Sequence, residues 1–594
     1  MSKLNLAIDA LLHAYRQKTF TPEFVVAQCL ARIAARPEAN IWIRVLSRDE
    51  LEPYLARLRG LDPASLPLYG LPFAVKDNID LAGIPTTAGC PAFAYTPTRS
   101  ASVVERLIAA GAIPLGKTNL DQFATGLVGT RSPFGACHNA FDPAWLSGGS
   151  SAGSAVAVAA GQVSFSLGTD TAGSGRVPAA FNNLVGLKPT RGLLSTTGVV
   201  PACRSLDCVS IFTLEATDAR RVFDVAAAFD ETDVYARPLQ AGQPAREGFV
   251  FGVPRDLEYF GDAATQACFE TAVAALQGLG GEAREIELTP MLAAARLLYE
   301  GPWVAERYAA IEDFIKDHPD ALFPVTRQII GPAIERTAVD AFKAQYRLLA
   351  LKQASDRILA PLDFILTPTA ATIYRRDEEA AAPLELNSRL GYYTNFMNLL
   401  DYSAIAVPAG FCPRGLPRGV TLFAGAFQDR ALLDYAEQLD VALGLPLGAT
   451  PARRGQPFPA VDPGSLRLAV CGAHMSGLPL NHELTGRGAR YAGSSRTAAS
   501  YRLFALAGGP PRRPGLVQVA GDGVAIEVEL WDLPLAEAGS FLAGIPAPLG
   551  IGTLRLVDGT RVQGFLCEAI ATAGAQDISA FGGWRGFLRS LAAA

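Results

Sequence analysis

One long stretch of the sequence, residues 143–169, contains no charged residue, and it constrains the fold more than any other feature. Asp142 and Asp170 border it, and glycine, serine and alanine dominate it. A helix that spans a bilayer needs about 20 mostly apolar residues, which a run rich in glycine and serine does not supply. We therefore expect a buried loop and helix inside a globular domain, and no association with a membrane.

The composition agrees with a large globular protein. The chain has 594 residues, 49% of them hydrophobic and 18% charged, which is ample apolar material for buried cores and excludes a disordered chain. At about 150 residues per domain, this length predicts two to four domains. The net charge of −5 leaves no basic excess for a nucleic-acid backbone, so nucleic acid is not an expected partner. The start of the chain lacks a basic stretch followed by an apolar core, and we expect a cytoplasmic protein.

The cysteines and histidines show none of the spacings that hold metals. Nine cysteines are scattered without a CxxC pair, and the five histidines form neither an HExxH nor an HxH pattern. We expect free thiols, no protein-bound metal and no cofactor.

Predicted helices alternate with short apolar strands over most of the chain. Residues 103–110 place apolar side chains at helical spacing, and a glycine and an apolar strand follow them, which is typical of an α/β fold. Prolines without apolar periodicity mark the segment around 450–465 as a linker. We therefore predict a first domain over 1–452, a linker over 453–464 and a strand-rich second domain over 465–594.

Two short motifs match well-known catalytic patterns, but their surroundings argue against both. Residues 111–118, GAIPLGKT, fit a phosphate-binding loop, yet the first glycine follows a predicted helix and Pro114 removes a backbone donor. Lys117 is therefore interpreted as an ordinary residue at a strand end. Residues 149–153, GSSAG, fit a nucleophile elbow around Ser151, yet no suitably placed histidine follows in the same domain.

The most informative segment is 146–192, where two loops rich in glycine and serine flank a small-residue helix and a short strand. Glycines such as Gly173 and Gly175 let several backbone N–H groups point to one place, as an oxyanion hole requires. Lys76 follows an apolar run that should bury it, and burial favours a neutral amine, which is a usable base. A serine with a lysine base is one way to build a hydrolase without histidine. The alternative interpretation is a pair of ordinary turns around a core helix, which would explain either loop alone. It does not explain why both loops carry serines or why a lysine follows the apolar run.

Four segments together resemble the amidase signature family. They are GLPFAVKDNID, GKTNLDQFATG, LSGGSSAGSAVAVAAG and GTDTAGSGRVPAAFNNLVGLKPTRG, and they occur in this order within roughly residues 20–450. The resemblance implies an α/β/α fold with a large mixed central sheet, and a triad of a serine, a second serine after a cis peptide bond, and a lysine.

The resemblance assigns each member of the triad to a position in this sequence. Ser174 stands at the place of the nucleophile, Ser150 at the place of the cis-peptide serine, and Lys76 at the place of the base. Lys76 would take a proton from Ser150, which would take one from Ser174. The implied oxyanion hole consists of four backbone N–H groups, those of Thr171, Ala172, Gly173 and Ser174.

Three further residues are expected to support these loops. Ser151 is interpreted as a loop-supporting serine, with orientation of Ser150 as the alternative role. Asp170 and Arg176 are expected to form a structural salt link that braces the loop of the nucleophile.

The segment GTDTAGSGR, followed by AAFNNLVGLKPT, resembles the allophanate hydrolases within this family. Their substrate is a small ureido carboxylate, for which the bidentate fork of an arginine is well suited. The resemblance points to Tyr299 and Arg307 for the carboxylate, with backbone near Gly126 as a further contact. Pro302 predicts that a helix begins between the first two. A core tyrosine and a surface arginine are the competing interpretation.

The second domain resembles the accessory domain of allophanate hydrolases, which is similar in fold to gamma-glutamylcyclotransferases, so we expect an α+β fold. Residues 471–481 stand where those proteins have a glycine-rich substrate loop, but 540–552 offers no carboxylate for their catalytic glutamate, and cyclotransfer is not expected. The resemblance implies a domain that speeds decarboxylation of the first product, with His474 as the candidate residue. A structural hydrogen bond is the alternative role of this histidine.

The leading hypothesis is hydrolysis of allophanate, a small-molecule substrate, to ammonia and N-carboxycarbamate, which then loses carbon dioxide and a second ammonia. Another amide, such as an aryl, fatty or aminoacyl-tRNA amide, is the alternative within the family. A non-catalytic scaffold is the alternative outside it. Since two-fold dimers are the commonest assembly, we expect a homodimer.

Overall fold

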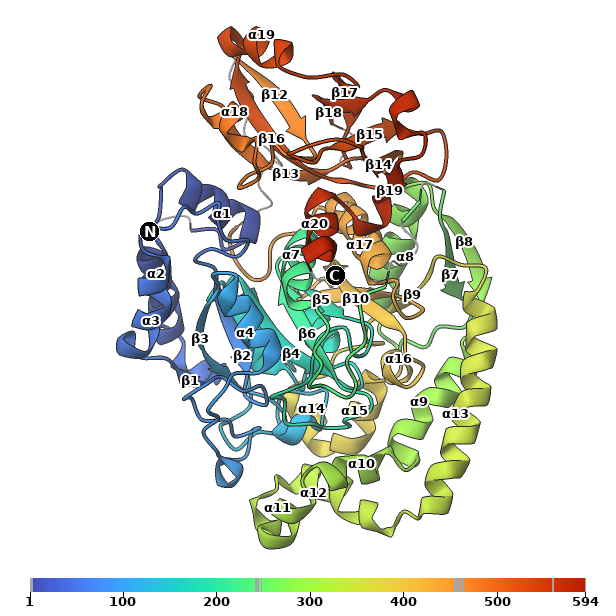
Figure 1. The fold of residues 1–594 in the computed structure, drawn as a ribbon. Coiled ribbons are helices and arrows are strands. Elements are labelled where there is room, and N and C mark those ends of the chain that lie inside the picture. Colours follow the sequence, from blue (N-terminus) through green and yellow to red (C-terminus); the bar gives the residue numbers. More distant parts are fainter. Residues whose placement is uncertain are drawn as a thin grey trace.

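The structure is a computed structural model that describes residues 4–240, 245–246, 248–452, 461, 464–557 and 560–592. Figure 1 shows a large body and, above it, a smaller strand-rich body formed by the C-terminal part of the chain. The predicted linker lies almost entirely outside the described residues, which include only 461 and 464 of it. The limits of the two domains therefore stay a prediction.

An eleven-stranded sheet forms the centre of the large body, with the spatial order β1-β3-β2-β4-β6-β5-β10-β11-β9-β7-β8. β2 is parallel to β3 and β4, whereas β4 and β6 are antiparallel, so the sheet is mixed, as predicted. Its strands are β1 (Trp42–Val45), β2 (Pro72–Lys76), β3 (Ile113–Thr118), β4 (Phe165–Asp170), β5 (Val185–Lys188), β6 (Cys208–Thr213), β7 (Val250–Pro254), β8 (Glu282–Ile286), β9 (Phe364–Pro368), β10 (Ser403–Phe411) and β11 (Pro417–Ala424).

The strands that carry the site are buried along their whole length. Every residue of β2, β3 and β4 is buried, as expected for strands that are covered on both faces of a sheet. All eight residues of α5 are buried against this sheet, which confirms the buried helix predicted from the uncharged stretch. The helices of this body are α1 (Ile8–Arg16), α2 (Pro22–Ala34), α3 (Arg48–Leu58), α4 (Ser102–Ala109), α5 (Ala152–Ala159), α6 (Val177–Phe181), α7 (Ala216–Ala226), α8 (Ala263–Gly278) and α17 (Asp429–Leu443).

A helical lobe, residues 289–359, includes the end of the large body that is farthest from the smaller one (Figure 1). Helix α9 ends at Glu300 and α10 begins at Trp303, so the helix start predicted from Pro302 is confirmed. No helix of the described residues is long and apolar enough to cross a membrane. The helices that lie between β8 and β10 in the sequence are α9 (Thr289–Glu300), α10 (Trp303–Ala310), α11 (Glu312–Asp317), α12 (Pro324–Ile330), α13 (Ala338–Leu359), α14 (Arg376–Ala381), α15 (Pro383–Leu390) and α16 (Phe396–Leu399).

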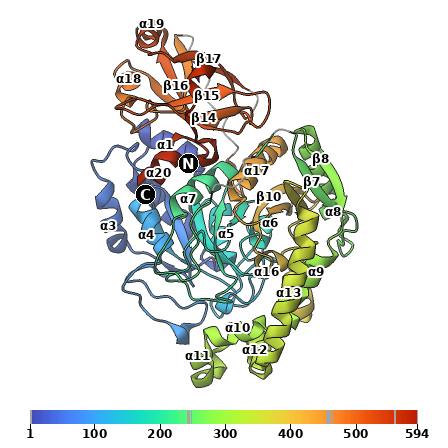
Figure 2. The ribbon, with the colours of Figure 1, turned by 45° about the vertical axis from the view of Figure 1, so that its right-hand side comes forward.

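The smaller body has its own sheets and its own apolar core, which confirms a separate strand-rich domain. Helix α20 returns to the large body beside α7, where Arg589 lies 3.9 Å from Asp224 (Figures 1 and 2). The likeness to gamma-glutamylcyclotransferases stays a prediction. The elements are β12 (Ser465–Val470), α18 (Asn481–Thr485), β13 (Arg490–Arg496), β14 (Tyr501–Ala505), β15 (Pro514–Gln518), β16 (Glu527–Pro534), α19 (Leu535–Ala543), β17 (Leu549–Arg555), β18 (Arg561–Cys567), β19 (Gln576–Asp577) and α20 (Trp584–Ala592).

Candidate active site

Lys76 is the last residue of β2, and its side chain is fully buried. Its Nζ donates to Ser150 Oγ at 2.8 Å and to Thr169 Oγ1 at 2.7 Å. No carboxylate of the described residues lies within ion-pair distance of it. Burial lowers the pKa of this amine to about 7, against the raising effect of more distant carboxylates such as Asp121. Lys76 is therefore largely neutral above pH 7, as a base must be.

Ser150 follows a cis peptide bond with Gly149, which confirms this feature of the predicted triad. Its carbonyl accepts the N–H of Asp121 at 3.1 Å. A Cβ at position 149 would lie 2.0 Å from the Asp121 carboxylate, so only glycine fits there. The adjacent Ser151 accepts the N–H of Thr169 at 3.3 Å and donates to its carbonyl at 3.1 Å. Ser151 thus ties the loop to β4, in agreement with the loop-supporting role.

The loop of Ser174 is held by a buried ion pair. Arg176 donates to both carboxylate oxygens of Asp170 at 2.9 Å, and neither side chain is exposed. The same carboxylate accepts the N–H groups of Gly173 and Gly175, both at 2.9 Å. Burial raises the pKa of Asp170, but the charge of Arg176 and the hydrogen bonds to the carboxylate outweigh burial, so the pKa lies below its ordinary value. The predicted salt link is confirmed.

The contact with Asp170 corrects one detail of the predicted oxyanion hole. Because the N–H of Gly173 is already donated to that carboxylate, it is not free for an oxyanion in this structure. The N–H groups of Thr171, Ala172 and Ser174 remain as the predicted donors. Ser174 is only 3% exposed, and its hydroxyl makes no hydrogen bond within the described part of the chain. The step from Ser150 to Ser174 therefore stays a prediction.

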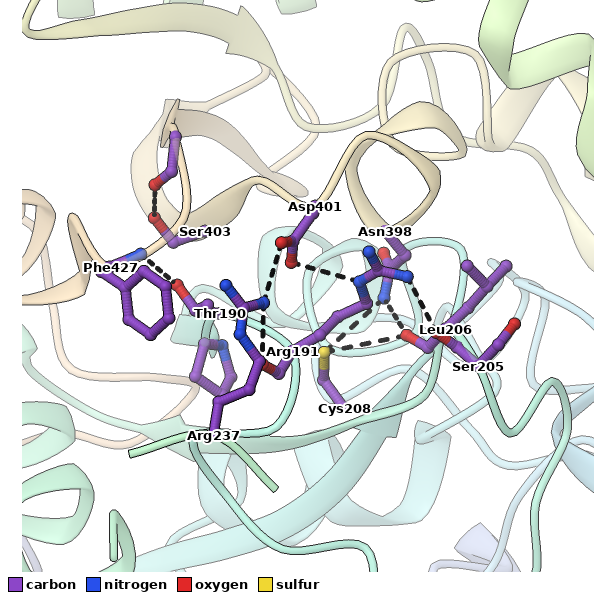
Figure 3. A network of polar contacts seen from close by, with 12 residues as sticks. Thr190, Arg191, Ser205, Leu206, Cys208, Arg237, Asn398, Asp401, Ser403 and Phe427 are labelled. Atoms are coloured by element: carbon purple, nitrogen blue, oxygen red, sulfur yellow. Dashed lines mark hydrogen bonds and ion pairs between the residues drawn. The ribbon is translucent and has the colours of Figure 1, made fainter. Parts of the chain in front are cut away.

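A polar network that the sequence did not reveal fixes the opposite side of this loop (Figure 3). Asn398 donates to the last carbonyl of β4 at 2.7 Å. It also donates to the carbonyl of Leu206 at 3.0 Å, as Figure 3 shows. Arg191 donates to the carbonyl of Ser205 at 2.8 Å and forms an ion pair with Asp401 at 3.1 Å. These bonds attach segment 205–206 to the start of the Ser174 loop. Their partners are far apart in the sequence, which is why no local pattern indicated them.

Asp207 is a second feature that the sequence did not reveal. Its carboxylate accepts the hydroxyl of Thr171 at 2.5 Å and the N–H of Ala202 at 2.8 Å, so it anchors a predicted member of the oxyanion hole. Burial raises the pKa of Asp207 to about 6. Its charge opposes the fall of the Lys76 pKa, whereas the charge of Arg307 adds to that fall. Asp207 and Arg307 therefore share one electrostatic environment with the base.

Arg307 is buried in α10, with 2% of its surface exposed, which excludes a surface arginine. It donates to Thr125 Oγ1 at 3.1 Å and to the carbonyl of Ala124 at 3.3 Å. Its guanidinium carbon lies 5.7 Å from the centre of the Tyr299 ring, so the predicted pair is brought together. No carboxylate of the described residues forms an ion pair with it. The backbone around Gly126 belongs to the same loop as its two hydrogen-bond partners.

His474 lies in the smaller body. Its Nε2 is 3.0 Å from Glu483 Oε2, and its ring stacks on Phe565 with 5.0 Å between centres. Burial lowers the pKa of His474, although Glu483 opposes this. These contacts favour the structural role, and a catalytic role stays a prediction.

The apparent phosphate-binding loop is part of the sheet, which confirms its rejection. Gly111 follows α4, and Lys117 lies within β3. Lys117 is fully buried, 3.1 Å from Asp77 and within 2.8 Å of Thr86 Oγ1. It is thus a buried ion-pair residue, which the sequence did not indicate.

Comparisons with known proteins identify the family of this chain. A model of the amidase family matches residues 25–433, and a model described as allophanate hydrolase C-terminal domain matches 466–589. Urea amidolyase of Saccharomyces cerevisiae is 44% identical over 93% of this chain, which covers 31% of that protein. The chain thus spans about a third of this relative's length. Urea amidolyase of Lachancea kluyveri is 43% identical over 96% of this chain, which covers 32% of that protein. The structure of Kluyveromyces lactis allophanate hydrolase aligns with 99% of this chain and 100% of its own at 40% identity and a TM-score of 0.73.

Proposed function

Since the chain belongs to the amidase family, we propose that it is an allophanate hydrolase that acts through Ser174. The observation that carries the chemistry is the buried contact of 2.8 Å between Lys76 Nζ and Ser150 Oγ. Burial lowers the pKa of this amine to about 7, so a large fraction of it is neutral at and above pH 7 and can accept a proton. The likeness to allophanate hydrolase and urea amidolyase supports the choice of substrate.

In the proposed reaction, Lys76 takes the proton of Ser150 as Ser150 takes that of Ser174. The Ser174 Oγ then attacks the terminal carbonyl of allophanate, and nearby backbone N–H groups stabilise the negative oxygen. Ammonia leaves with the proton returned through the relay, which gives an acyl ester on Ser174. Water, deprotonated by the same relay, releases N-carboxycarbamate and restores the serine. That product loses one carbon dioxide to give carbamate, and carbamate loses a second carbon dioxide to give the second ammonia.

The buried charge of Arg307 supports a substrate that carries a carboxylate. A guanidinium that is buried without a counterion in the free protein is costly, and an incoming carboxylate would compensate it. The Tyr299 ring lies 5.7 Å from the guanidinium carbon and belongs to the same proposed site. The charge of Arg307 also helps to lower the pKa of Lys76, which supports a position near the proposed relay.

The test compares allophanate with biuret, a neutral amide of nearly the same shape in which a carboxamide replaces the carboxylate. The assay is run well above the pKa of Lys76, so that the base is neutral in the parent and in the variant. Replacing Arg307 with Gln removes a hydrogen-bonded charge, so kcat/KM for allophanate should fall by about 10- to 100-fold, whereas biuret turnover at that pH should hardly change. Equal losses for both compounds, or no loss, would point to a different amide as the substrate.

We propose further that the smaller body speeds decarboxylation of the first product through His474, and that the protein is a cytoplasmic homodimer. Replacing His474 with Gln in the full chain should then delay the second ammonia without slowing the first. Simultaneous release of both by the variant, as in the parent, would leave His474 with its structural bond to Glu483 alone. Sedimentation at several concentrations measures the assembly.

A further inference from the structure

A cavity of about 300 Å³ lies between the helical lobe and α15. Tyr299, Gln328, Asn387 and Ser388 are polar residues of its wall, and half of the residues that line it are apolar. Arg336 is the one charged residue among the described residues that line it, so the charge at its wall is positive. A volume of this size is within the range of small-molecule sites.

Two residues of the cavity wall lie next to the candidate active site. Tyr299, in its wall, is the residue that lies beside the Arg307 guanidinium. Asn387, also in its wall, accepts the N–H of Leu127 at 2.8 Å through its side-chain oxygen. Leu127 belongs to the loop that begins at Asp121, whose N–H is bonded to the carbonyl of Ser150. Two residues of the cavity wall are therefore in contact with residues of the candidate active site.

The outer end carries an available cation. Arg336 is exposed, directly before the N-terminal cap of α13, and forms no ion pair with any described residue. Asp340, the acid whose pKa Arg336 lowers, is already bonded to the N–H of Thr337 at 3.0 Å and to its hydroxyl at 2.7 Å. The guanidinium of Arg336 can thus meet an anion from solvent.

A second cavity, of about 340 Å³, also borders the site, but most of the charges that line it are negative. Three carboxylates, those of Asp80, Asp207 and Asp233, line it, with Arg204 as the opposing charge. Asp207 connects it to the Ser174 loop through Thr171. An anion would be repelled by these carboxylates, so the two cavities are not equivalent routes.

We propose that the cavity lined by Arg336 is the entrance through which an anionic substrate reaches Ser174, and that Arg336 is its outer anion contact. The identity of the anion rests on the proposed function. Arg336 attracts the carboxylate from solvent, the polar side chains of the cavity take it up, and Arg307 holds it beside the relay. Because Arg336 acts on encounter and not on chemistry, it contributes to kcat/KM and not to kcat.

The test replaces Arg336 with Gln and with Glu in the full chain, with Arg414→Gln, an exposed arginine elsewhere, as the matched control. At low ionic strength, Arg336→Gln should lower kcat/KM for allophanate by about 3- to 10-fold and Arg336→Glu by more. Both losses should shrink as salt screens the charge, and kcat should not change. Biuret turnover and the control should be unaffected. Equal losses for allophanate and biuret, or no loss for either variant, would overturn the proposal.

A second readout separates this inference from the proposed function. Two fluorophosphonate probes that differ only in a carboxylate on the tail label Ser174 without any turnover. The ratio of their labelling rates, anionic over neutral, should fall in Arg336→Gln and stay constant in Arg414→Gln. A parent protein that is labelled but does not hydrolyse allophanate would contradict the proposed function. An unchanged ratio in Arg336→Gln would contradict the entrance.

Discussion

Lys76 and Lys117 lie on neighbouring parallel strands and are both fully buried, yet their surroundings differ in the one respect that matters. Lys117 has a carboxylate, Asp77, at 3.1 Å, whereas Lys76 has two hydroxyl groups and no counterion among the described residues. Burial lowers the pKa of both amines, and Asp77 opposes that fall for Lys117. The comparison indicates that burial alone does not suit an amine to the proposed role of base. Lys76 differs by having no counterion, and burying an amine without a counterion lowers the free energy of unfolding.

Replacing Lys76 with Met should have the largest effect on activity. Without the base, neither serine is activated, and kcat should fall by at least about 10³-fold. The variant should unfold at the same or a higher temperature than the parent, because a buried amine without a counterion is removed. Steady-state kinetics and thermal unfolding measure the two effects. A variant that kept most of its turnover would refute the role of Lys76.

Replacing Lys117 with Met should lower the stability of the protein and leave its activity unchanged. The carboxylate of Asp77 would stay buried without its partner, and the free energy of unfolding should fall by about 3–5 kcal/mol. The folded variant should keep the kcat of the parent. Urea unfolding followed by tryptophan fluorescence measures the loss, and the added change Asp77→Asn should recover part of it. A loss of kcat in the folded variant would show that the two lysines are not separate in function.

The pH dependence should follow Lys76 and not Lys117. Because the base must be neutral, kcat/KM should fall about tenfold for each pH unit below the pKa of about 7 and level off above it. The effect of Lys76 on the free energy of unfolding covers a different pH range. The pKa of Lys76 falls from 10.5 in the unfolded chain to about 7 on folding. Its burial therefore lowers the free energy of unfolding most below pH 7 and not at all above pH 10.5. The profile of Lys117→Met should match that of the parent, and a shifted profile would count against the assignment.

The smallest effect is expected from Thr169→Val, which keeps Lys76 but removes one of its two hydroxyl partners. The amine would be less well oriented toward Ser150, and kcat should fall by about 2- to 10-fold. The midpoint of the pH profile should also move, which a purely structural change would not cause. Thr367→Val is the control, because Thr367 is a buried threonine on β9 whose hydroxyl has no hydrogen-bond partner among the described residues. Identical effects of the two substitutions would argue against a positioning role for Thr169.

The sequence predicted most of what is local, and little of what depends on distant contacts. The burial of Lys76 follows from the apolar run before it. The mixed sheet and the cis peptide at Ser150 are implied by the resemblance of continuous motifs to a known family. The partners of the Ser174 loop do not, because Asp207 and Asn398 reach it from residues that the strand order brings together. Apolar periodicity records which side chains are buried but not which neighbour they meet. For the same reason, the sequence did not distinguish the ion pair of Lys117 from an ordinary strand residue.

The most direct test of the relay is the rate at which a neutral fluorophosphonate labels Ser174 as a function of pH. If neutral Lys76 activates Ser174 through Ser150, labelling should rise with pH to a plateau with a midpoint near 7, and it should be nearly abolished in Lys76→Met. Lys117→Met should label like the parent. Labelling of Ser174 that is independent of pH, or that survives in Lys76→Met, would contradict the account.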